Sequence, residues 1–231
     1  MIKKLSILIL LLLIIYYSCK KEPLDQKPIH VPTYTLLLSK VYANDSLFCE
    51  YTYDSGFVVK EQGSDGTIPF NYNNHLLESE SFFGYNLFCL YNPKGQLIQT
   101  KFTTDQTADI VYSDFVYDSL NIKEVISFNT TELGYIKYTY DGHGNISQES
   151  LYQFPNVLTE KVTYTYDDKH NPYESLSTMP GTGTNANNVI KEVRTLLDTT
   201  LVTTNTYEYN SYDFPSTKNG NIIFTYKIIQ K

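Results

Sequence analysis

Short runs of alternating apolar and polar residues fill the chain from about residue 34 onward, and one phrase recurs within them. It consists of an aromatic residue, any residue and Tyr, followed by Asp or Asn. Alternation with period two puts both rings of a copy on the same face of a strand. The clear copies are Tyr51-Thr52-Tyr53-Asp54, Phe70-Asn71-Tyr72-Asn73, Phe115-Val116-Tyr117-Asp118, Tyr138-Thr139-Tyr140-Asp141, Tyr164-Thr165-Tyr166-Asp167 and Tyr207-Glu208-Tyr209-Asn210, with a weaker copy at Cys89-Leu90-Tyr91-Asn92.

The spacing of these copies indicates a repeat architecture. Counted from the second tyrosine, they lie 19, 19, 26, 23, 26 and 43 residues apart. Repetition at such periods means that each unit needs its neighbours to bury one face. The short connections predict antiparallel hairpins in chain order and about sixteen strands. Since so long a sheet curls or rolls, we predict an all-β fold, a long antiparallel β-meander of repeated hairpins forming a curved sheet or roll.

The turns carry residue-level predictions. The Asp or Asn after each phrase can bond a backbone N–H two residues further on and begin a turn. Asp141-Gly142-His143-Gly144-Asn145 should reverse the chain with at least one glycine at positive φ. Alternation in the next strand places Ile146, Gln148 and Ser150 on one face and Ser147, Glu149 and Leu151 on the other. Further turns are predicted at Ala43–Ser46, Gly63–Gly66, Phe83–Tyr85 and Pro155–Asn156.

One segment interrupts the regular repetition of the phrase. Residues Asn171–Asn188 have the composition of a loop. The following stretch, Val189–Leu197, suits either a helix face or a strand. A strand is favoured, because Asp198-Thr199-Thr200 is typical of a hairpin turn that leads into another β-rich run.

The N-terminus is typical of a targeting segment. Lys3 and Lys4 precede an apolar run, Leu5–Tyr17, which is too short for a membrane-spanning helix of about 20 residues. Tyr16-Tyr17-Ser18-Cys19 resembles a bacterial lipobox, with Tyr16 in place of the usual Leu. The resemblance implies cleavage after residue 18 and lipidation of Cys19, which attaches the chain to a membrane. An ordinary signal peptide is the alternative.

This segment sets the expected domain organisation: residues 1–18 form a lipoprotein signal peptide, 19–33 a lipidated cysteine and tether, and 34–231 the β-meander domain. The tether contains Pro23, Pro28 and Pro32 with several charges and no alternation, which keeps a chain extended. Its start, Cys19–Glu22, loosely resembles the surface-export signals of Bacteroides-group lipoproteins. An outer-membrane lipoprotein that faces the periplasm or the cell surface is therefore expected.

Composition narrows the function classes. The chain has 18 basic and 25 acidic residues, and Arg194 is its single arginine. Nucleic-acid binding needs a concentrated positive surface, so we expect no nucleic-acid partner. Tyrosine is unusually frequent, with 22 residues and no tryptophan.

Two family resemblances follow from the phrase. Tyr138–Ile146 resembles the YD repeat of RHS-type proteins, which build β-hairpin shells; the other copies lack its Gly-Asn pair. Residues 164–173, Asn187-Asn188-Val189, 207–210 and Phe214-Pro215 resemble uncharacterised β-meander lipoproteins of the Bacteroides group. This second resemblance implies the same fold and supplies no catalytic residues.

The aromatic rows are the first candidate site. Cross-strand ring packing stabilises a sheet, whereas exposed rings bind sugars or extended peptides through a flat apolar face and a hydroxyl group. The candidate ligand-facing residues are Tyr51, Tyr53, Tyr138, Tyr140, Tyr164 and Tyr166. Ser46 and Ser119 lie in Asp-Ser-Leu motifs that resemble O-glycosylation sites of exported Bacteroides-group proteins.

The remaining chemistry is sparse. His75, His143 and His170 follow copies of the phrase, but units about 10 Å apart cannot converge on one ion, so no metal and no cofactor are expected. Cys49 and Cys89 are expected to be separate buried thiols, and a disulfide would require a rolled sheet. No nucleophile motif is present. Carboxylates that recur after the phrase could pair to hydrolyse glycosides; they are Glu78, Glu124, Glu149 and Glu174.

These observations favour a lipid-anchored envelope protein without catalytic activity that acts as a binding or structural module. Its partners would be the membrane, reached through the lipid, and a glycan or protein ligand. The alternative is an envelope glycoside hydrolase that uses paired carboxylates.

Overall fold

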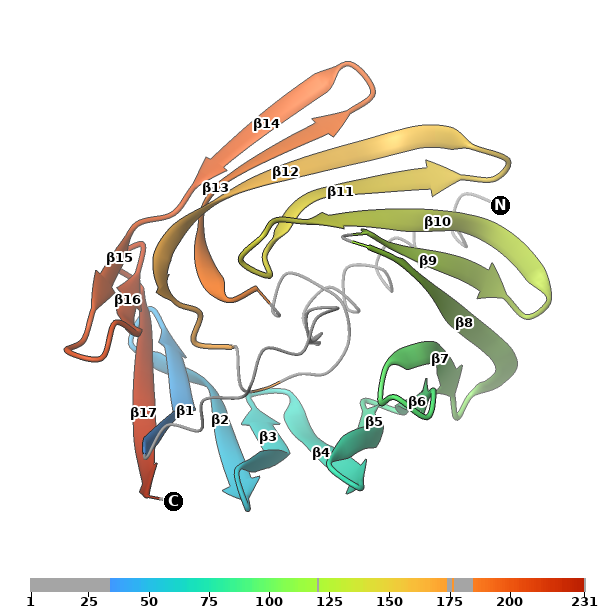
Figure 1. Cartoon of the computed structure of the whole chain (residues 1–231). Helices are drawn as coiled ribbons and strands as arrows, with labels where there is room; N and C mark the ends of the chain where they lie inside the picture. The colour runs from blue at the N-terminus through green and yellow to red at the C-terminus, as the bar shows by residue number, and fades with distance from the viewer. Residues whose placement is uncertain (1–33, 120, 174–175, 177–184, 231) are drawn as a thin grey trace.

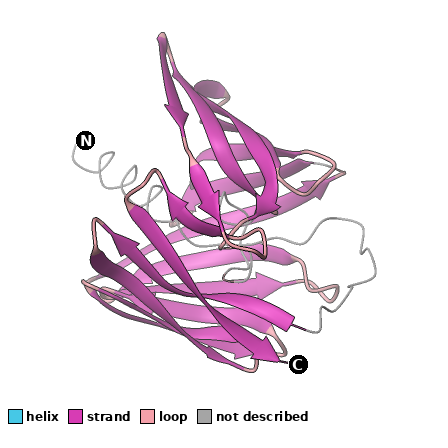
Figure 2. Cartoon of the chain, turned by 90° about the vertical axis from the view of Figure 1, so that its left-hand side faces the viewer, coloured by secondary structure: helices cyan, strands magenta, loops and turns pink. Residues whose placement is uncertain are grey.

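A computed structural model describes residues 34–230 apart from 120, 174–175 and 177–184. Within that part the regular elements are all β-strands, as the colouring of Figure 2 shows. In chain order they are β1 (Tyr34–Ala43), β2 (Ser46–Asp54), β3 (Phe57–Gly63), β4 (Gly66–Asn73), β5 (Leu76–Phe82), β6 (Tyr85–Tyr91), β7 (Leu97–Thr104), β8 (Thr107–Asp118), β9 (Asn121–Phe128), β10 (Thr131–Tyr140), β11 (Ile146–Gln153), β12 (Val157–His170), β13 (Asn187–Leu196), β14 (Thr199–Thr204), β15 (Tyr207–Tyr209), β16 (Pro215–Lys218) and β17 (Ile222–Gln230).

The predicted antiparallel meander is confirmed, with 17 strands in one sheet. Each strand from β1 to β14 pairs with its chain neighbour, and β15, β16 and β17 do the same. The sheet curls so far that β1 also pairs with β17, in a register that runs from Tyr34 opposite Gln230 to Ala43 opposite Ile222. Figure 1 shows the resulting arrangement, in which the blue first strand lies beside the red last one.

The sheet is nevertheless not closed. No ladder joins β14 to β15 in the part of the chain that the structure describes. Side chains cross the lower part of this seam. The Tyr207 hydroxyl donates to the Val189 carbonyl oxygen at 3.1 Å, and the Tyr209 hydroxyl donates to Asp167. An ion pair of 3.1 Å joins Lys169 Nζ to Asp213 Oδ1.

Tight turns set the hairpin geometry. Four two-residue hairpin turns lying wholly within the described residues have both central residues at positive φ, the conformation that matches the twist of the strands on either side. They are Asn44-Asp45, Ser55-Gly56, Asn74-His75 and Phe83-Gly84. The predicted reversal after Asp141 is also confirmed, with Gly144 at φ +90°. There Asp141 Oδ1 accepts hydrogen bonds from the backbone N–H groups of His143 and Asn145 at 2.8 and 2.9 Å.

The repeated phrase has a fixed cross-strand partner. Its first aromatic residue stands directly opposite a glutamate on the next strand in five hairpins. The pairs are Tyr51–Glu61, Phe70–Glu80, Phe115–Glu124, Tyr138–Glu149 and Tyr164–Glu192. The second tyrosine of each copy stands opposite an apolar residue, for example Tyr140 opposite Ile146. Each repeat therefore contributes the same four side chains to one face.

Bulges correct the simple alternation predicted after the turns. Between Tyr140–Ile146 and Thr139–Gln148 the register shifts by one residue, so Ser147 is the extra residue. Ile146 and Glu149 are consequently both buried, although alternation had placed them on opposite faces. A bulge inserts one residue and reverses the face of everything beyond it.

Two clusters of buried side chains form the core. The larger cluster spans β6 to β11 and includes Phe115, Ile122 and Tyr138. The smaller cluster contains Leu38, Tyr51 and Phe224, and so lies across the junction of β1, β2 and β17. The contact between the first and last strands is therefore part of the hydrophobic core.

Tyrosine hydroxyl groups tie two of the hairpins, β8–β9 and β12–β13, to the preceding one. Tyr117 donates to the carbonyl oxygen of Leu97 at 2.5 Å, and Tyr166 donates to that of Ile146 at 2.6 Å. In both cases the acceptor begins the returning strand of the preceding hairpin. In these two copies the second tyrosine thus partly buries its ring and hydrogen-bonds a neighbouring unit.

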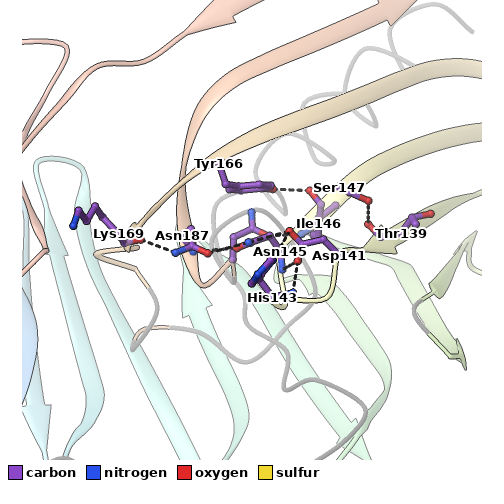
Figure 3. A network of polar contacts seen from close by, with 10 residues as sticks. Thr139, Asp141, His143, Asn145, Ile146, Ser147, Tyr166, Lys169 and Asn187 are labelled. Carbon is purple, nitrogen blue, oxygen red and sulfur yellow. Dashed lines mark hydrogen bonds and ion pairs between the residues drawn. The ribbon is translucent and has the colours of Figure 1, made fainter.

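Asparagine side chains join the β10–β11 and β12–β13 hairpins in the same way (Figure 3). The Asn145 side chain donates to Asn187 Oδ1 at 3.0 Å, and the Asn187 N–H donates to Asn145 Oδ1 at 3.0 Å. Asn187 Nδ2 also donates to the Lys169 carbonyl oxygen at 3.0 Å. Buried polar groups require such partners, so this network is structural.

Candidate functional site

An open hollow lies where β3 begins and β4 ends, beside the smaller core cluster. Its volume is about 540 Å³. Phe70 lines it and packs against that core cluster as well. The lining residues are Asp54, Ser55, Phe57, Val59, Phe70, Asn71, Tyr72, Asn74 and His75.

Two consecutive copies of the phrase build this hollow. Asp54 ends the first copy, and Phe70 and Tyr72 are the aromatic residues of the second. The Ser55-Gly56 turn returns the chain so that Phe57 faces the second copy, and the Asn74-His75 turn brings His75 back toward Phe57. Positive φ at all four turn positions makes both reversals tight enough for these contacts.

The rings form a compact group. The Phe57 and Tyr72 ring centroids are 5.3 Å apart at an interplanar angle of 51°. The His75 ring stacks on Phe57 at 5.1 Å and 27°. Phe57, Tyr72 and Phe70 are half-buried, whereas His75 is exposed. The group thus presents apolar ring surface to solvent with Asp54 and Asn74 at its border, an arrangement suited to a ligand that has both apolar and hydroxyl groups.

The Tyr72 hydroxyl stays protonated at neutral pH. Burial, reinforced by the negative charges available to Glu80 and Cys89, raises the pKa of Tyr72 to about 12. A neutral phenol can both donate and accept a hydrogen bond. Tyr72 therefore contributes an uncharged aromatic side chain to the lining of the hollow.

The carboxylates do not assemble in this hollow. Asp54 is the one acidic residue among its lining residues. Glu124 and Glu149 are buried, Glu78 is exposed, and Glu174 lies outside the described residues. Glu80, two residues after Glu78, is the buried glutamate of that hairpin, because it stands opposite Phe70. Sequence reasoning missed it, although its distance from the phrase matches that of Glu61.

Glu124 is the best-defined of the buried acids. Ser113 Oγ donates to its Oε1 and the Tyr138 hydroxyl donates to its Oε2, each at 2.6 Å. Burial raises the pKa of Glu124, and the two hydrogen bonds oppose this effect. Burial likewise raises the pKa of Glu61, which receives a hydrogen bond from Tyr51. These acids contact tyrosine and serine hydroxyls of the core.

The six tyrosines predicted to face a ligand lie elsewhere than the hollow. Tyr51 and Tyr138 are 6% and 4% exposed and belong to the core clusters, which leaves no ring face for a ligand. Tyr53, Tyr140, Tyr164 and Tyr166 are half-buried. The Tyr53 hydroxyl donates to the Leu38 carbonyl oxygen at 2.7 Å. The aromatic group of the hollow instead includes Phe57, which lies outside the repeated phrase. In the sequence, the one signal for Phe57 is its position directly after the Ser55-Gly56 turn.

The other candidate residues are dispersed. Ser46, the first residue of β2, and Ser119, in a turn, are both exposed, and Cys19 lies outside the described residues. Cys49 and Cys89 are free cysteines, the first buried and the second half-buried. His143 and His170 are exposed, and no group of three or more metal-binding side chains occurs among the described residues. Within the same ranges, no helical segment has the length and apolar character needed to cross a membrane.

The comparisons with known proteins concern the fold. No family model and no curated protein matches the chain. Among solved structures, the chain is similar to a porin-like protein from Bacteroides vulgatus ATCC 8482, with a TM-score of 0.58 and 12% identity over 84% of this chain and 99% of that chain. A porin-like protein from Bacteroides uniformis ATCC 8492 aligns at a TM-score of 0.37 and 10% identity, over 84% of this chain and 86% of that chain. The first comparison establishes a shared fold.

Proposed function

We propose that this chain is a lipid-anchored, non-catalytic protein of the bacterial cell envelope that binds a carbohydrate in the hollow between β3 and β4. The observation that carries the proposal is the ring group of half-buried Phe57 and Tyr72 with exposed His75, bordered by Asp54 and Asn74. A sugar ring has an apolar C–H face and a rim of hydroxyl groups, so ring stacking and short polar side chains recognise it together.

Envelope attachment is supported by two separate observations. An apolar run of 13 residues, Leu5–Tyr17, ends close to Cys19, as in a lipobox. The fold resembles that of a porin-like protein from Bacteroides vulgatus. A single lipid chain gives weak membrane binding, so two or more chains on Cys19 are needed for stable anchoring.

A binding role fits the hollow better than hydrolysis does. Hydrolysis of a glycoside by the usual route needs two carboxyl groups about 5–9.5 Å apart on either side of the bond. The hollow offers the carboxylate of Asp54, while Glu80, which stands opposite Phe70, is buried and is not among the lining residues. A single acid beside aromatic rings can orient a hydroxyl group without cleaving the sugar.

The test is a glycan-array screen of the detergent-solubilised full chain, followed by calorimetry on the best ligand. Phe57→Ala and His75→Ala should each weaken binding about 3- to 10-fold, since one aromatic contact contributes roughly 0.5–1.5 kcal/mol. Tyr212→Ala removes an aromatic residue that is 58% exposed outside the hollow and should bind normally. Unchanged affinity in both hollow variants would reject this site, and release of shorter sugars during the assay would indicate a hydrolase.

A further inference from the structure

We infer that β14 is a homodimerisation edge, at which two copies of this chain pair antiparallel across a twofold axis through Val202. Among the described strands, β14 has a ladder with β13 alone. All six of its residues are exposed, including Leu201 at 51% and Val202 at 58%. The β13–β14 hairpin stands at the top of the molecule in Figures 1 and 2, where its outer edge is accessible.

The backbone groups on that edge can be assigned from the register. The two-residue turn at Leu197-Asp198 places Leu196 and Thr199 opposite each other, and the hydrogen bond from Asn205 N–H to the Ile190 carbonyl oxygen, at 2.9 Å, continues the same register. In an antiparallel pair, opposed residues alternate between bonded and non-bonded pairs. Odd-numbered residues of β14 therefore bond β13. Thr200, Val202 and Thr204 direct their N–H and C=O groups outward.

This edge lacks the features that keep sheet edges from pairing. Natural edge strands are shortened, bulged or interrupted by charge or proline. The other side of the seam has them, because β15 has three residues and a bulge at Tyr209. In contrast, β14 reads Thr-Thr-Leu-Val-Thr-Thr, pairs with β13 without a register shift and contains neither charge nor proline. Such an edge is suited to accept a strand.

The sequence of β14 identifies a second copy as that strand. The outward residues read Thr200, Val202, Thr204, which is the same in both directions. With the axis at Val202, each outward residue meets an outward residue of the second copy: Val202 meets Val202, and Thr200 meets Thr204. This register satisfies all three outward residues at once, and threonine–threonine pairs are favourable across strands. A twofold pair also occupies the outward edge of β14 in both copies, so no third copy can add at this edge.

The neighbouring strand β13 agrees with this register. Val193 stands opposite Val202, so the dimer would continue a row of four valines across both copies. On the other face, Arg194 stands opposite Leu201 and Glu192 opposite Thr203. Because Leu201 would face Thr203 of the second copy, each such row has Arg194 at one end and Glu192 at the other. No like charges are brought together.

The first test is the mass of the detergent-solubilised full chain, measured by sedimentation velocity over a range of concentrations. The wild type should be a dimer. Val202→Pro removes one outward N–H without removing a bond to β13, and should shift the dissociation constant upward at least 10-fold. Val202→Thr retains that N–H and should remain dimeric. A monomeric wild type, or a dimer unaffected by Val202→Pro, would overturn the inference; pairing with a different protein would give the first of these results.

Cysteine crosslinking tests the register and does not require the proline variant to fold. In a bonded pair the Cα atoms are about 5.5 Å apart, within disulfide reach, so Val202→Cys should crosslink to itself under mild oxidation. Two copies of Thr200→Cys would place their cysteines about 14 Å apart and should stay uncrosslinked. Equal crosslinking of both variants, or crosslinking of Thr200→Cys alone, would reject the axis at Val202.

Discussion

Tyr138 donates its hydroxyl hydrogen to Oε2 of Glu124 at 2.6 Å, between two strands of the larger core cluster. Ser113 occupies the other carboxylate oxygen. Tyr138, the first aromatic residue of one copy of the phrase, thus donates a hydrogen bond to Glu124 on the preceding strand. Glu124 in turn stands opposite Phe115, the first aromatic residue of the preceding copy. Glu124 and Tyr138 therefore couple two repeats through polar contacts inside an otherwise apolar layer.

Glu124 should make stability depend on pH. Burial raises its pKa in the folded state above that of the unfolded chain, which is about 4.3 for glutamate. The stabilisation of the folded state by the protonated Glu124 carboxyl group is therefore fully present below about pH 4.3. It is lost as the pH rises through the pKa of Glu124 in the folded state. Glu124→Gln removes this ionisation, so the variant should gain stability relative to wild type between pH 4 and pH 8, as measured by urea unfolding. The exposed Glu78→Gln should show no such divergence, and parallel curves for Glu124→Gln would contradict the prediction.

Tyr166→Phe should destabilise the domain by about 1–2 kcal/mol. The variant keeps the ring but removes the donor to the Ile146 carbonyl oxygen, which then loses a buried partner. Tyr212→Phe, at a residue 58% exposed, serves as the control and should change stability by less than about 0.5 kcal/mol. Urea unfolding of both variants gives the comparison. Similar losses in the two would show that the hydroxyl does not join the hairpins energetically.

Gly134→Ala should be among the most damaging substitutions in the sheet. A Cβ atom at this position would lie 2.1 Å from the Tyr152 carbonyl oxygen, so the backbone would have to move. Overpacking of this kind costs about 1–3 kcal/mol or more. Gly142→Ala is the matched control, since no atom lies within 4 Å of its Cβ position. A thermal melt should separate the two variants by several degrees, and equal melting temperatures would argue against the close approach.

Gly144→Val should destabilise the domain more than His143→Ala does. No atom would contact the new Cβ, but φ of +90° is unfavourable for a β-branched residue by roughly 1–2 kcal/mol. His143 is 84% exposed at its side chain, with Nδ1 3.9 Å from Asp141 Oδ2. Hydrogen exchange should reveal loosening first between residues 138 and 166, near the altered turn. Greater damage from His143→Ala would point to a further contact of that histidine.

Cys19→Ala should release the protein from the membrane. The proposed anchor is a lipid on this residue, and without it the tether carries no stretch apolar enough to hold a bilayer. Partitioning between detergent and aqueous phases measures the effect, with Cys49→Ala as a control that keeps the anchor. Retention of the Cys19 variant in the detergent phase would mean that another part of the chain binds lipid.

The repeated phrase was sufficient to predict the fold class, the antiparallel order of the strands and the turn at Gly144, because each depends on contacts between residues close in sequence. The strand Asn187–Leu196 was also predicted correctly from its adjacent turn. The β1–β17 pairing was left open, since closure depends on curvature accumulated over the whole sheet. A local sequence pattern does not reveal the total curvature of a sheet of many strands.

The candidate site was harder to predict for a related reason. The sequence drew attention to the most regular tyrosine pairs, yet regularity reflects burial, as at Tyr51 and Tyr138. The hollow forms where Phe57 and His75 add rings from the turns to a standard copy. The register shift at Tyr53 that accompanies Phe57 and Val58 is a bulge, which alternation cannot reveal.

The pairing of the first strand with the last sets an order for assembly. Lys40 accepts a hydrogen bond from Thr225, 185 residues later in the chain. Hairpins from β2 onward can form as soon as each is made, but β1 must wait with one open edge until the C-terminal residues arrive. The last strand therefore covers the remaining open edge of β1. A chain shortened before β17 would keep most of its hairpins, yet the edge of β1 would be exposed to pairing with other molecules.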